Sequence, residues 1–179
     1  DGETCEAGET ILRLSGFASA LLTAERTALN FLQRLSGIAT LTRRFVDAAG
    51  ARTTILDTRK TTPTLRVLEK YAVRAGGAVN HRLALDDGLL IKDNHVDAGG
   101  GVEDVVTKAR ASSPVGMKIQ VEVRTLAELQ SAIKAKADMV LLDNMSIEML
   151  REAVQQARSV DLITEASGGV TLETVRAIA

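Results

Sequence analysis

The feature that most constrains the fold of this chain is a repeated alternation of short apolar segments with longer amphipathic ones after residue 52. The five apolar segments lie at residues 53–56, 89–91, 118–121, 139–142 and 162–164. Helical patterns follow them at residues 64–75, 102–111, 125–135 and 146–158, and a last one begins at Thr171. Strands that alternate with helices of this length pair in parallel through right-handed crossovers. The sequence therefore predicts an α/β fold.

The chain before this alternation has a different pattern. Residues 1–15 hold two glycines and a short apolar stretch at 10–14, which is typical of the end of a β-rich segment. A helix is predicted from Thr23, as N-cap, to about Ala49, because leucine and isoleucine recur every three residues. Ser36 and Gly37 predict a break in this helix, and Gly50 predicts its end.

Composition excludes several classes of protein. The 22 basic and 23 acidic residues give a net charge of −1, and the chain has three Phe, one Tyr and no Trp. A nucleic-acid partner is therefore not expected. No apolar run approaches the length of a membrane span, and the first residues do not resemble a secretory signal. The single cysteine, Cys5, excludes an internal disulfide and fits a reducing, cytoplasmic location.

Polar residues follow each predicted strand at its carboxyl end. They are Asp57 and Arg59, then Lys92, Glu122, Asp143 and Ser167. In a parallel sheet or barrel these ends lie on one face, where active sites are built. Any one of them could be a solvated turn residue, but the same placement in five successive units favours a functional site.

The basic members of this face indicate an anionic ligand. They are Arg59, Lys60, Arg82 and Lys92, with His81 nearby. Arginine binds carboxylate or phosphate in a planar, bidentate manner, and lysine acts as a point charge. This set predicts a small polyanionic substrate. His81 has an alternative interpretation as a buried structural histidine, and His95 is expected to be a loop residue that supports the site.

The remaining members suggest phosphate and metal chemistry. Glu122 and Asp143 suit Mg²⁺ held together with substrate phosphates. Ser167, Gly168 and Gly169 have the features of a phosphate-binding loop, although a simple turn has the same composition. Two histidines without further cysteine or histidine do not make a zinc site. The glycines at 99–101 lack the pattern of a P-loop and predict a flexible turn.

Several stretches together resemble the quinolinate phosphoribosyltransferase family. The stretches are 22–31 (LTAERTALNF), 35–40 (LSGIAT), 57–63 (DTRKTTP), 80–83 (NHRL), 90–95 (LIKDNH), 121–123 (VEV) and 142–144 (LDN). The resemblance runs in order over essentially the whole chain, and the DTRKTTP and LIKDNH stretches are highly specific together. The resemblance implies transfer of a phosphoribosyl group from phosphoribosyl pyrophosphate to quinolinate with decarboxylation. The products are nicotinate mononucleotide, pyrophosphate and CO₂, in NAD biosynthesis with Mg²⁺.

The resemblance also implies roles for individual residues. Arg59, Arg82, Lys92 and His81 correspond to residues that hold quinolinate, and Thr58 and Lys60 complete the strand-end loop. Glu122 and Asp143 correspond to residues that engage the ribose and Mg²⁺ of phosphoribosyl pyrophosphate, and Ser167 to Gly169 to half of its 5′-phosphate cradle. Arg26 corresponds to a residue shared across a homodimer, which could assemble further into hexamers.

The implied architecture is an incomplete parallel (βα) barrel. Such barrels usually need roughly 250 residues. Family members begin with a separate α/β sandwich domain, to which residues 1–22 would belong, with the partial catalytic barrel at 23–179. They also continue beyond the position of Ala179, so we expect the chain alone to bind phosphoribosyl pyrophosphate weakly. Two other interpretations stay open: a relative associated with molybdenum transport, and a non-catalytic anion-binding barrel fragment.

Overall fold

The computed structural model describes residues 1–179 and divides them into two units. The N-terminal unit is Asp1–Leu83 and the C-terminal unit is Ala84–Ala179. No helix in the structure combines the length and the apolar character needed to cross a membrane.

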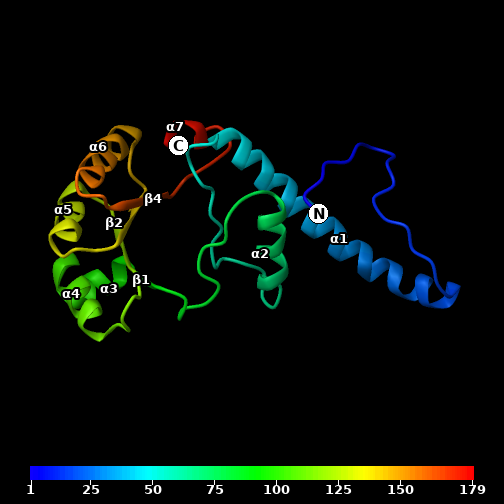
Figure 1. Ribbon diagram of the computed structural model, residues 1–179, viewed down its shortest axis with the longest axis horizontal. Helices are drawn as coiled ribbons and strands as arrows, with labels where there is room; N and C mark the ends of the chain where they lie inside the picture. The colour runs from blue at the N-terminus through cyan, green and yellow to red at the C-terminus, as the bar shows by residue number, and fades with distance from the viewer. The chain divides into compact units, whose positions relative to one another are not determined.

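The C-terminal unit is built on a parallel sheet of four strands in the order β1-β2-β3-β4 (Figure 1). The strands are β1 Leu89–Ile91, β2 Ile119–Val123, β3 Met139–Asp143 and β4 Ile163–Ser167. The helices are α3 Asp93–Gly99, α4 Val102–Ser112, α5 Leu126–Lys134, α6 Ile147–Arg158 and the short α7 Val175–Ile178. The predicted α/β fold with parallel strands is confirmed.

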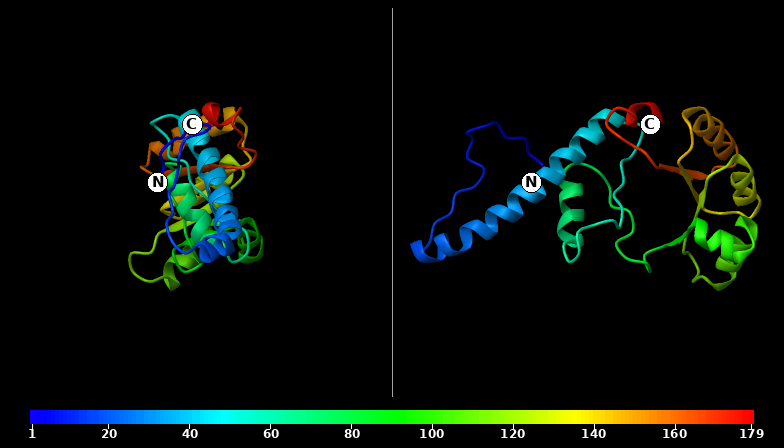
Figure 2. Two further views of the ribbon diagram at one scale, coloured as in Figure 1. Left: turned by 90° about the vertical axis from the view of Figure 1, so that its right-hand side faces the viewer. Right: turned by 180° about the vertical axis from the view of Figure 1, so that it is seen from behind.

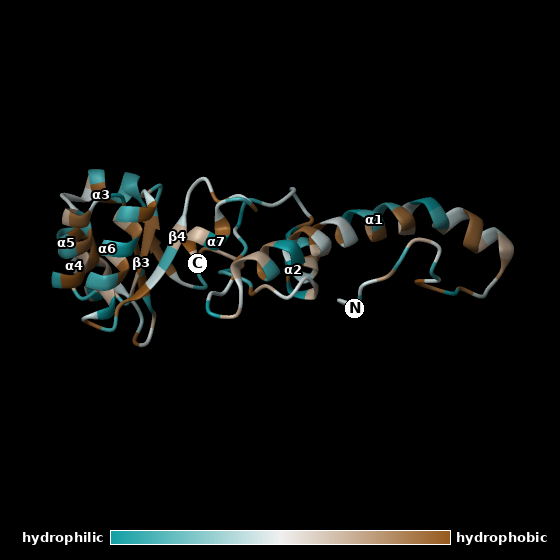
Figure 3. Ribbon diagram, turned by 90° about the horizontal axis from the view of Figure 1, so that it is seen from above, coloured by the Kyte–Doolittle hydropathy of each residue, from teal (hydrophilic) through white to brown (hydrophobic).

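One face of the sheet packs against helices and forms the core. Alternate strand residues such as Val121, Val140 and Leu142 are almost fully buried on this side, with Val106 of α4 and Leu129 of α5. Figure 1 shows α4, α5 and α6 along this face, and Figure 3 shows apolar residues on β3. Each buried side chain of this size contributes about 1.5–3 kcal/mol to folding. The other residues of each strand point to the opposite face, which carries the polar strand ends.

Two helices of this layer begin at side-chain caps that the sequence supplies. Thr125 Oγ1 accepts a hydrogen bond from the Glu128 N–H at 3.1 Å, and Ser146 Oγ accepts one from the Met149 N–H at 3.3 Å. These bonds satisfy amide groups that have no partner inside a helix. The caps fix where α5 and α6 start, directly after the polar ends of β2 and β3.

The N-terminal unit contains the 32-residue helix α1, Ala18–Ala49, and the helix α2, Arg66–Ala75 (Figure 2). The carboxyl end of α2 approaches α1 closely at Gly76. A Cβ atom there would lie 2.5 Å from the Ala39 carbonyl oxygen and 2.6 Å from the Thr42 Cβ. The close approach therefore requires glycine. No residue of α1 is buried, although apolar residues recur along it (Figure 3).

The prediction for α1 was wrong in two details. The helix begins at Ala18, and the Thr23 hydroxyl lies inside it, where it donates to the Ser19 carbonyl at 2.7 Å. The predicted break at Ser36 and Gly37 does not occur. A single glycine in a helix costs about 1 kcal/mol, which a helix of this length tolerates. The predicted end at Gly50 is confirmed.

Four other predicted elements also differ. Residues 53–56 form no strand but one isolated bridge between Leu56 and Val79, because no neighbouring segment continues the ladder. The stretch 10–14 is exposed and extends no sheet. The last helix starts at Val175 because Thr171 and Thr174 bond to each other's backbone amides in a turn. Of the glycines at 99–101, Gly99 is the last residue of a short helix, α3, that the sequence did not reveal, and only Gly100 and Gly101 follow it.

Candidate active site

The predicted strand-end residues of the C-terminal unit occupy adjacent parallel strands. Asp143, the last residue of β3, pairs in register with Ser167 of β4. The Ser167 hydroxyl donates a hydrogen bond to Asp143 Oδ1 at 2.6 Å. On the other side, Lys92 Nζ lies 3.9 Å from Glu122 Oε2. The structure therefore places Lys92, Glu122, Asp143 and Ser167 along one edge of the sheet, as the sequence predicted.

Glu122 and Asp143 form a pair of interacting carboxylates, here called the carboxylate pair. Only 10% of the Glu122 side chain is exposed. Burial, followed by the negative charge of Asp143, raises the pKa of Glu122 above its ordinary value, and the charge of Lys92 opposes this. Two acids in this arrangement favour a cation or a group that develops positive charge beside them.

Residues with positive φ follow both β3 and β4. Gly168 has φ 89° and Asn144 has φ 53°. The Asn144 N–H donates to the Ser167 carbonyl at 2.9 Å, and Asn144 Nδ2 donates to Asp143 Oδ2 at 2.7 Å. Asn144 thereby joins the ends of β3 and β4. The sequence did not single out Asn144, although its position after the strand-end aspartate was visible.

Replacing Gly168 by alanine is expected to destabilise the protein by about 1–3 kcal/mol, because alanine disfavours its φ. An added Cβ would also overlap Asn144 Oδ1 and lie 2.9 Å from the Asn144 nitrogen. Urea unfolding measures the effect. Gly169→Ala is the matched control, since Gly169 has φ 62° but open space at the Cβ position. An equal loss in both variants would contradict the role assigned to the Asn144 contact.

His95 lies in α3 and shapes the backbone at Lys92. The Lys92 N–H donates to His95 Nδ1 at 2.9 Å, and the His95 N–H donates to the Lys92 carbonyl at 2.8 Å. The reciprocal bonds close the first turn of the helix directly after β1. His95 therefore supports the backbone beside Lys92, as the sequence predicted, but it does so from a helix and not from the predicted loop.

In the N-terminal unit, Arg59 and Arg82 form a second pair of like charges, here called the guanidinium pair. Arg59 Nε is buried and has no hydrogen-bond partner. Burial, and then the positive charge of Arg59, lowers the pKa of Arg82. A buried donor without an acceptor beside a second guanidinium indicates that an anion completes this arrangement.

The segments around the guanidinium pair are held by local hydrogen bonds. Thr58 Oγ1 accepts from the Lys60 N–H at 3.0 Å, so Thr58 fixes the turn that carries Arg59. His81 Nδ1 accepts from the Arg82 N–H at 2.8 Å, which leaves the ring hydrogen on Nε2 as a donor. Arg66 donates to the Arg59 carbonyl at 3.2 Å and to the Leu83 carbonyl at 3.3 Å. Arg66 was not singled out from the sequence.

Arg26 contacts none of the other predicted site residues. It lies on the exposed surface of α1, and its side chain forms no hydrogen bond or ion pair. Lys92, which the sequence analysis grouped with the basic residues 59–82, lies in the C-terminal unit beside Glu122.

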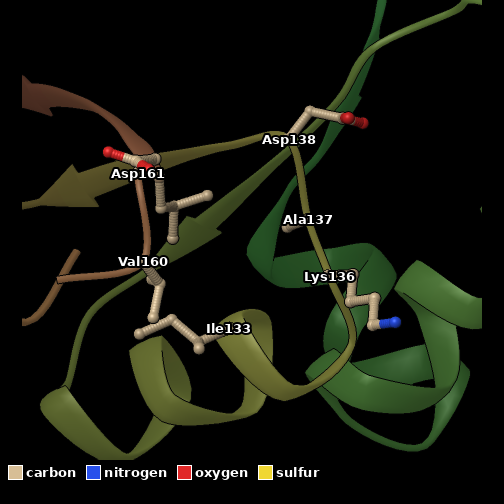
Figure 4. Close-up of a pocket in the computed structure, with 7 residues that line it drawn as sticks. Ile133, Lys136, Ala137, Asp138, Val160 and Asp161 are labelled. Atoms are coloured by element: carbon tan, nitrogen blue, oxygen red, sulfur yellow. The ribbon is translucent and has the colours of Figure 1, made fainter. Parts of the chain in front are cut away.

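A hollow of about 390 Å³ in the C-terminal unit lies at the opposite ends of the strands (Figure 4). It is lined by Asp138, which precedes β3, and by Asp161 and Leu162, which precede β4. Active sites of parallel sheets form at the carboxyl ends of the strands. This hollow is therefore separate from the carboxylate pair.

The structure defines an α/β protein with polar residues at the carboxyl ends of its parallel strands. Residues 38–179 match the model of the C-terminal domain of quinolinate phosphoribosyl transferase, and residues 1–36 match that of its N-terminal domain. The chain belongs to the quinolinate phosphoribosyl transferase family.

Curated relatives and solved structures agree with this assignment. The chain is 46% identical to a probable nicotinate-nucleotide pyrophosphorylase (carboxylating) of Synechocystis, and the match extends over 100% of this chain and 62% of the relative. The corresponding values for a Bacillus subtilis relative of the same name are 48%, 99% and 61%. NadC from Streptococcus pyogenes matches with a TM-score of 0.93 and 44% identity, over 98% of this chain and 62% of the other. The chain thus spans about three fifths of the length of these relatives.

Proposed function

We propose that the protein transfers the phosphoribosyl group of phosphoribosyl pyrophosphate to quinolinate, with release of pyrophosphate and CO₂. The product is nicotinate mononucleotide. The observation that carries the proposal is the guanidinium pair, in which the buried Nε of Arg59 has no hydrogen-bond partner, and burial, followed by the charge of Arg59, lowers the pKa of Arg82. Quinolinate is a pyridine dicarboxylate, and its two adjacent carboxylates match two guanidinium groups.

The residues of the N-terminal unit bind the acceptor in this proposal. Arg59 and Arg82 hold the carboxylates, and the Nε2 hydrogen of His81 donates a further hydrogen bond. Lys60 adds positive charge at the same turn, whose shape Thr58 sets. Fixing the dicarboxylate in one orientation presents its ring nitrogen to the ribose and lowers the entropic cost of the reaction.

The residues of the C-terminal unit bind the donor. The carboxylate pair engages the ribose hydroxyls and stabilises the positive charge that develops at the ribose C1, an effect transferred by analogy from glycoside hydrolysis. The turn of Ser167, Gly168 and Gly169 binds the 5′-phosphate through its amide groups. Lys92 balances the charge of Glu122 and contributes to binding the anionic substrates.

The carboxylate pair fits Mg²⁺, since its oxygens are hard ligands, and burial, followed by the charge of Asp143, raises the pKa of Glu122. When bound with phosphoribosyl pyrophosphate, Mg²⁺ supplies charge neutralisation for the departing pyrophosphate. In our proposal Glu122 and Asp143 hold it together with the substrate phosphates.

Loss of CO₂ follows phosphoribosyl transfer in this scheme. When the ring nitrogen bonds to the ribose C1, the pyridine becomes a positively charged pyridinium. The bond from ring C2 to its carboxylate then breaks, its electron pair is accepted by the ring, and a proton adds at C2. Measured CO₂ release should therefore depend on phosphoribosyl pyrophosphate. Release from quinolinate alone would overturn this order of events.

The architecture and assembly are proposed on the same basis. Residues 1–22 would belong to the N-terminal sandwich domain and residues 23–179 to the partial barrel. Arg26, which is exposed on α1, would be contributed to the site of a partner subunit in a homodimer. A cytoplasmic location fits the chemistry of NAD biosynthesis.

The test is formation of nicotinate mononucleotide from quinolinate, phosphoribosyl pyrophosphate and Mg²⁺. We suggest assaying the chain itself and a chimera that adds the C-terminal segment of the Bacillus subtilis relative, because the chain spans 61% of that protein. Product that disappears in Arg82→Ala and in Glu122→Ala supports the proposal. Product that persists in both variants would contradict the assigned residues, and absence of quinolinate binding would contradict the proposed acceptor.

A further inference from the structure

A buried ion pair in the N-terminal unit lies behind the proposed quinolinate-binding residues. Lys70 of α2 and Asp57 are 4% and 7% exposed at their side chains, and Lys70 Nζ lies 2.5 Å from Asp57 Oδ1. Asn80 Nδ2 donates to Asp57 Oδ2 at 2.6 Å and to the Lys70 carbonyl at 2.9 Å. We call Asp57, Lys70 and Asn80 the clamp.

The clamp connects two segments that are distant in sequence. Lys70 Nζ also donates to the His81 carbonyl at 2.9 Å, and the His81 N–H donates to Asp57 Oδ1 at 2.8 Å. Asp57 directly precedes the turn with Thr58 and Arg59, and His81 directly precedes Arg82. The position of each guanidinium relative to the other is therefore set through this network.

The backbone alone provides little to hold these segments together. Their only strand-like pairing is the isolated bridge between Leu56 and Val79. A buried ion pair is also a poor source of stability, since apolar residues of similar volume often serve as well. Its value lies in specifying one geometry, which matters most where two binding groups must match the spacing of two carboxylates.

We propose that Lys70 is a positioning residue for the dicarboxylate acceptor, which it orients through Asp57 and the His81 backbone without touching the ligand. This inference rests on the proposed function, since it assigns the clamp to the binding of quinolinate. The clamp keeps Arg59 and Arg82 at a fixed separation and aims the His81 ring. Loss of the Lys70 ammonium leaves the Asp57 carboxylate buried with its Asn80 and His81 donors only, so both segments relax.

The experiment compares the binding of two ligands by NMR titration of the full chain. Lys70→Met is expected to weaken quinolinate binding by about 10- to 100-fold, by analogy with the loss of a group that orients a metal ligand. Binding of phosphoribosyl pyrophosphate with Mg²⁺ should change by no more than about twofold, because the hydrogen bonds of the Lys70 ammonium go to Asp57 and the His81 carbonyl and not to the residues proposed to bind this ligand. Lys70→Arg, which keeps a cationic donor, should recover part of the lost affinity.

Nitrogen-15 spectra add a readout that a general loss of stability would not move. The chain has two histidines, so the ring signals of His81 and His95 can be told apart. Lys70→Met should shift the His81 ring signals and leave those of His95 unchanged. If Lys70→Met fails to fold, Asn80→Ala removes two clamp bonds while it retains the buried pair, and should show the same selective loss of quinolinate binding.

The matched control is Asp138→Asn in the C-terminal unit. Asp138 accepts hydrogen bonds from Arg110 and from the Ile119 N–H, at 2.7 and 2.8 Å, at the opposite ends of the strands. This variant should lower stability without changing the ratio of the two affinities. If Lys70→Met weakens the binding of both ligands equally, or leaves quinolinate binding unchanged, the inference is overturned and the proposed function still stands. If the unmodified chain does not bind quinolinate, the proposed function fails and the inference fails with it.

Discussion

Replacing Glu122 by glutamine is expected to raise the stability of the protein at neutral pH and to lower kcat/KM by about 10²- to 10³-fold. The loss is the size expected when one electrostatic group at a developing charge is removed. The gain in stability follows from the raised pKa of Glu122, which burial and then Asp143 cause. A carboxylate held in an unfavourable environment weakens the fold whenever it is ionised.

The sign of the pH dependence follows from linkage. Because the pKa of Glu122 is raised in the folded state, the folded protein retains its proton to a higher pH than the unfolded chain. Stability therefore falls as pH rises from the ordinary glutamate pKa of 4.5 through the folded pKa. Thermal unfolding should show a Tm advantage of Glu122→Gln that is absent at low pH and complete above the folded pKa.

Glu152→Gln is the control for this prediction. Glu152 is an exposed acid on α6, in the helical layer. Its replacement should leave both the activity and the pH dependence of Tm unchanged. A Glu122→Gln variant that is less stable than the parent at pH 7, or equally active, would contradict the role of the carboxylate pair.

Replacing Arg82 by alanine is expected to weaken quinolinate binding by about 2–3 kcal/mol, which corresponds to roughly 30- to 150-fold. The same change should not lower Tm, because burial and the charge of Arg59 disfavour the ionised Arg82 side chain in the absence of an anion. The His81 ring should stay in place, since its Nδ1 accepts from the backbone N–H of residue 82. Calorimetric titration with quinolinate and thermal unfolding test both parts.

Two comparisons sharpen the Arg82 experiment. Nicotinate has one carboxylate, so the parent should prefer quinolinate over nicotinate and the Arg82→Ala variant should lose most of this preference. Arg74→Ala, at the exposed end of α2, serves as the control and should leave binding unchanged. An unaltered preference in Arg82→Ala would show that Arg82 does not recognise the second carboxylate.

Much of the C-terminal unit could be predicted from the sequence because its signals are local. The sequence predicted strands β1 to β4 from short apolar runs with a polar residue near their carboxyl ends, and parallel pairing brings those ends together. That rule was sufficient to place Lys92, Glu122, Asp143 and Ser167 along one edge. The bridge at Leu56 shows its limit, because residues 53–56 have strand composition but no neighbouring strand with which to form a ladder.

The missed residues depend on contacts between distant segments. Lys70 has the appearance of an ordinary surface lysine on a helix, and only the folded chain shows that it meets Asp57 thirteen positions away. Asn144 likewise follows a strand end but acts through Gly168, in a turn that a different strand provides. Sequence periodicity reports which face of an element is apolar, but it does not report which polar groups meet.

The uneven support along helix α1 should affect the rates at which its amide hydrogens exchange with solvent. At 1.5 Å per residue its 32 residues extend about 48 Å, and none of them is buried. Its second half is supported by the Arg34 ion pair with Glu69, at 2.6 Å, and by the close contact of Ala39 with Gly76. Its first turns have no such support. Hydrogen exchange along α1 should therefore slow progressively from Ala18 toward Ala39, so that one continuous helix contains regions of very different local stability.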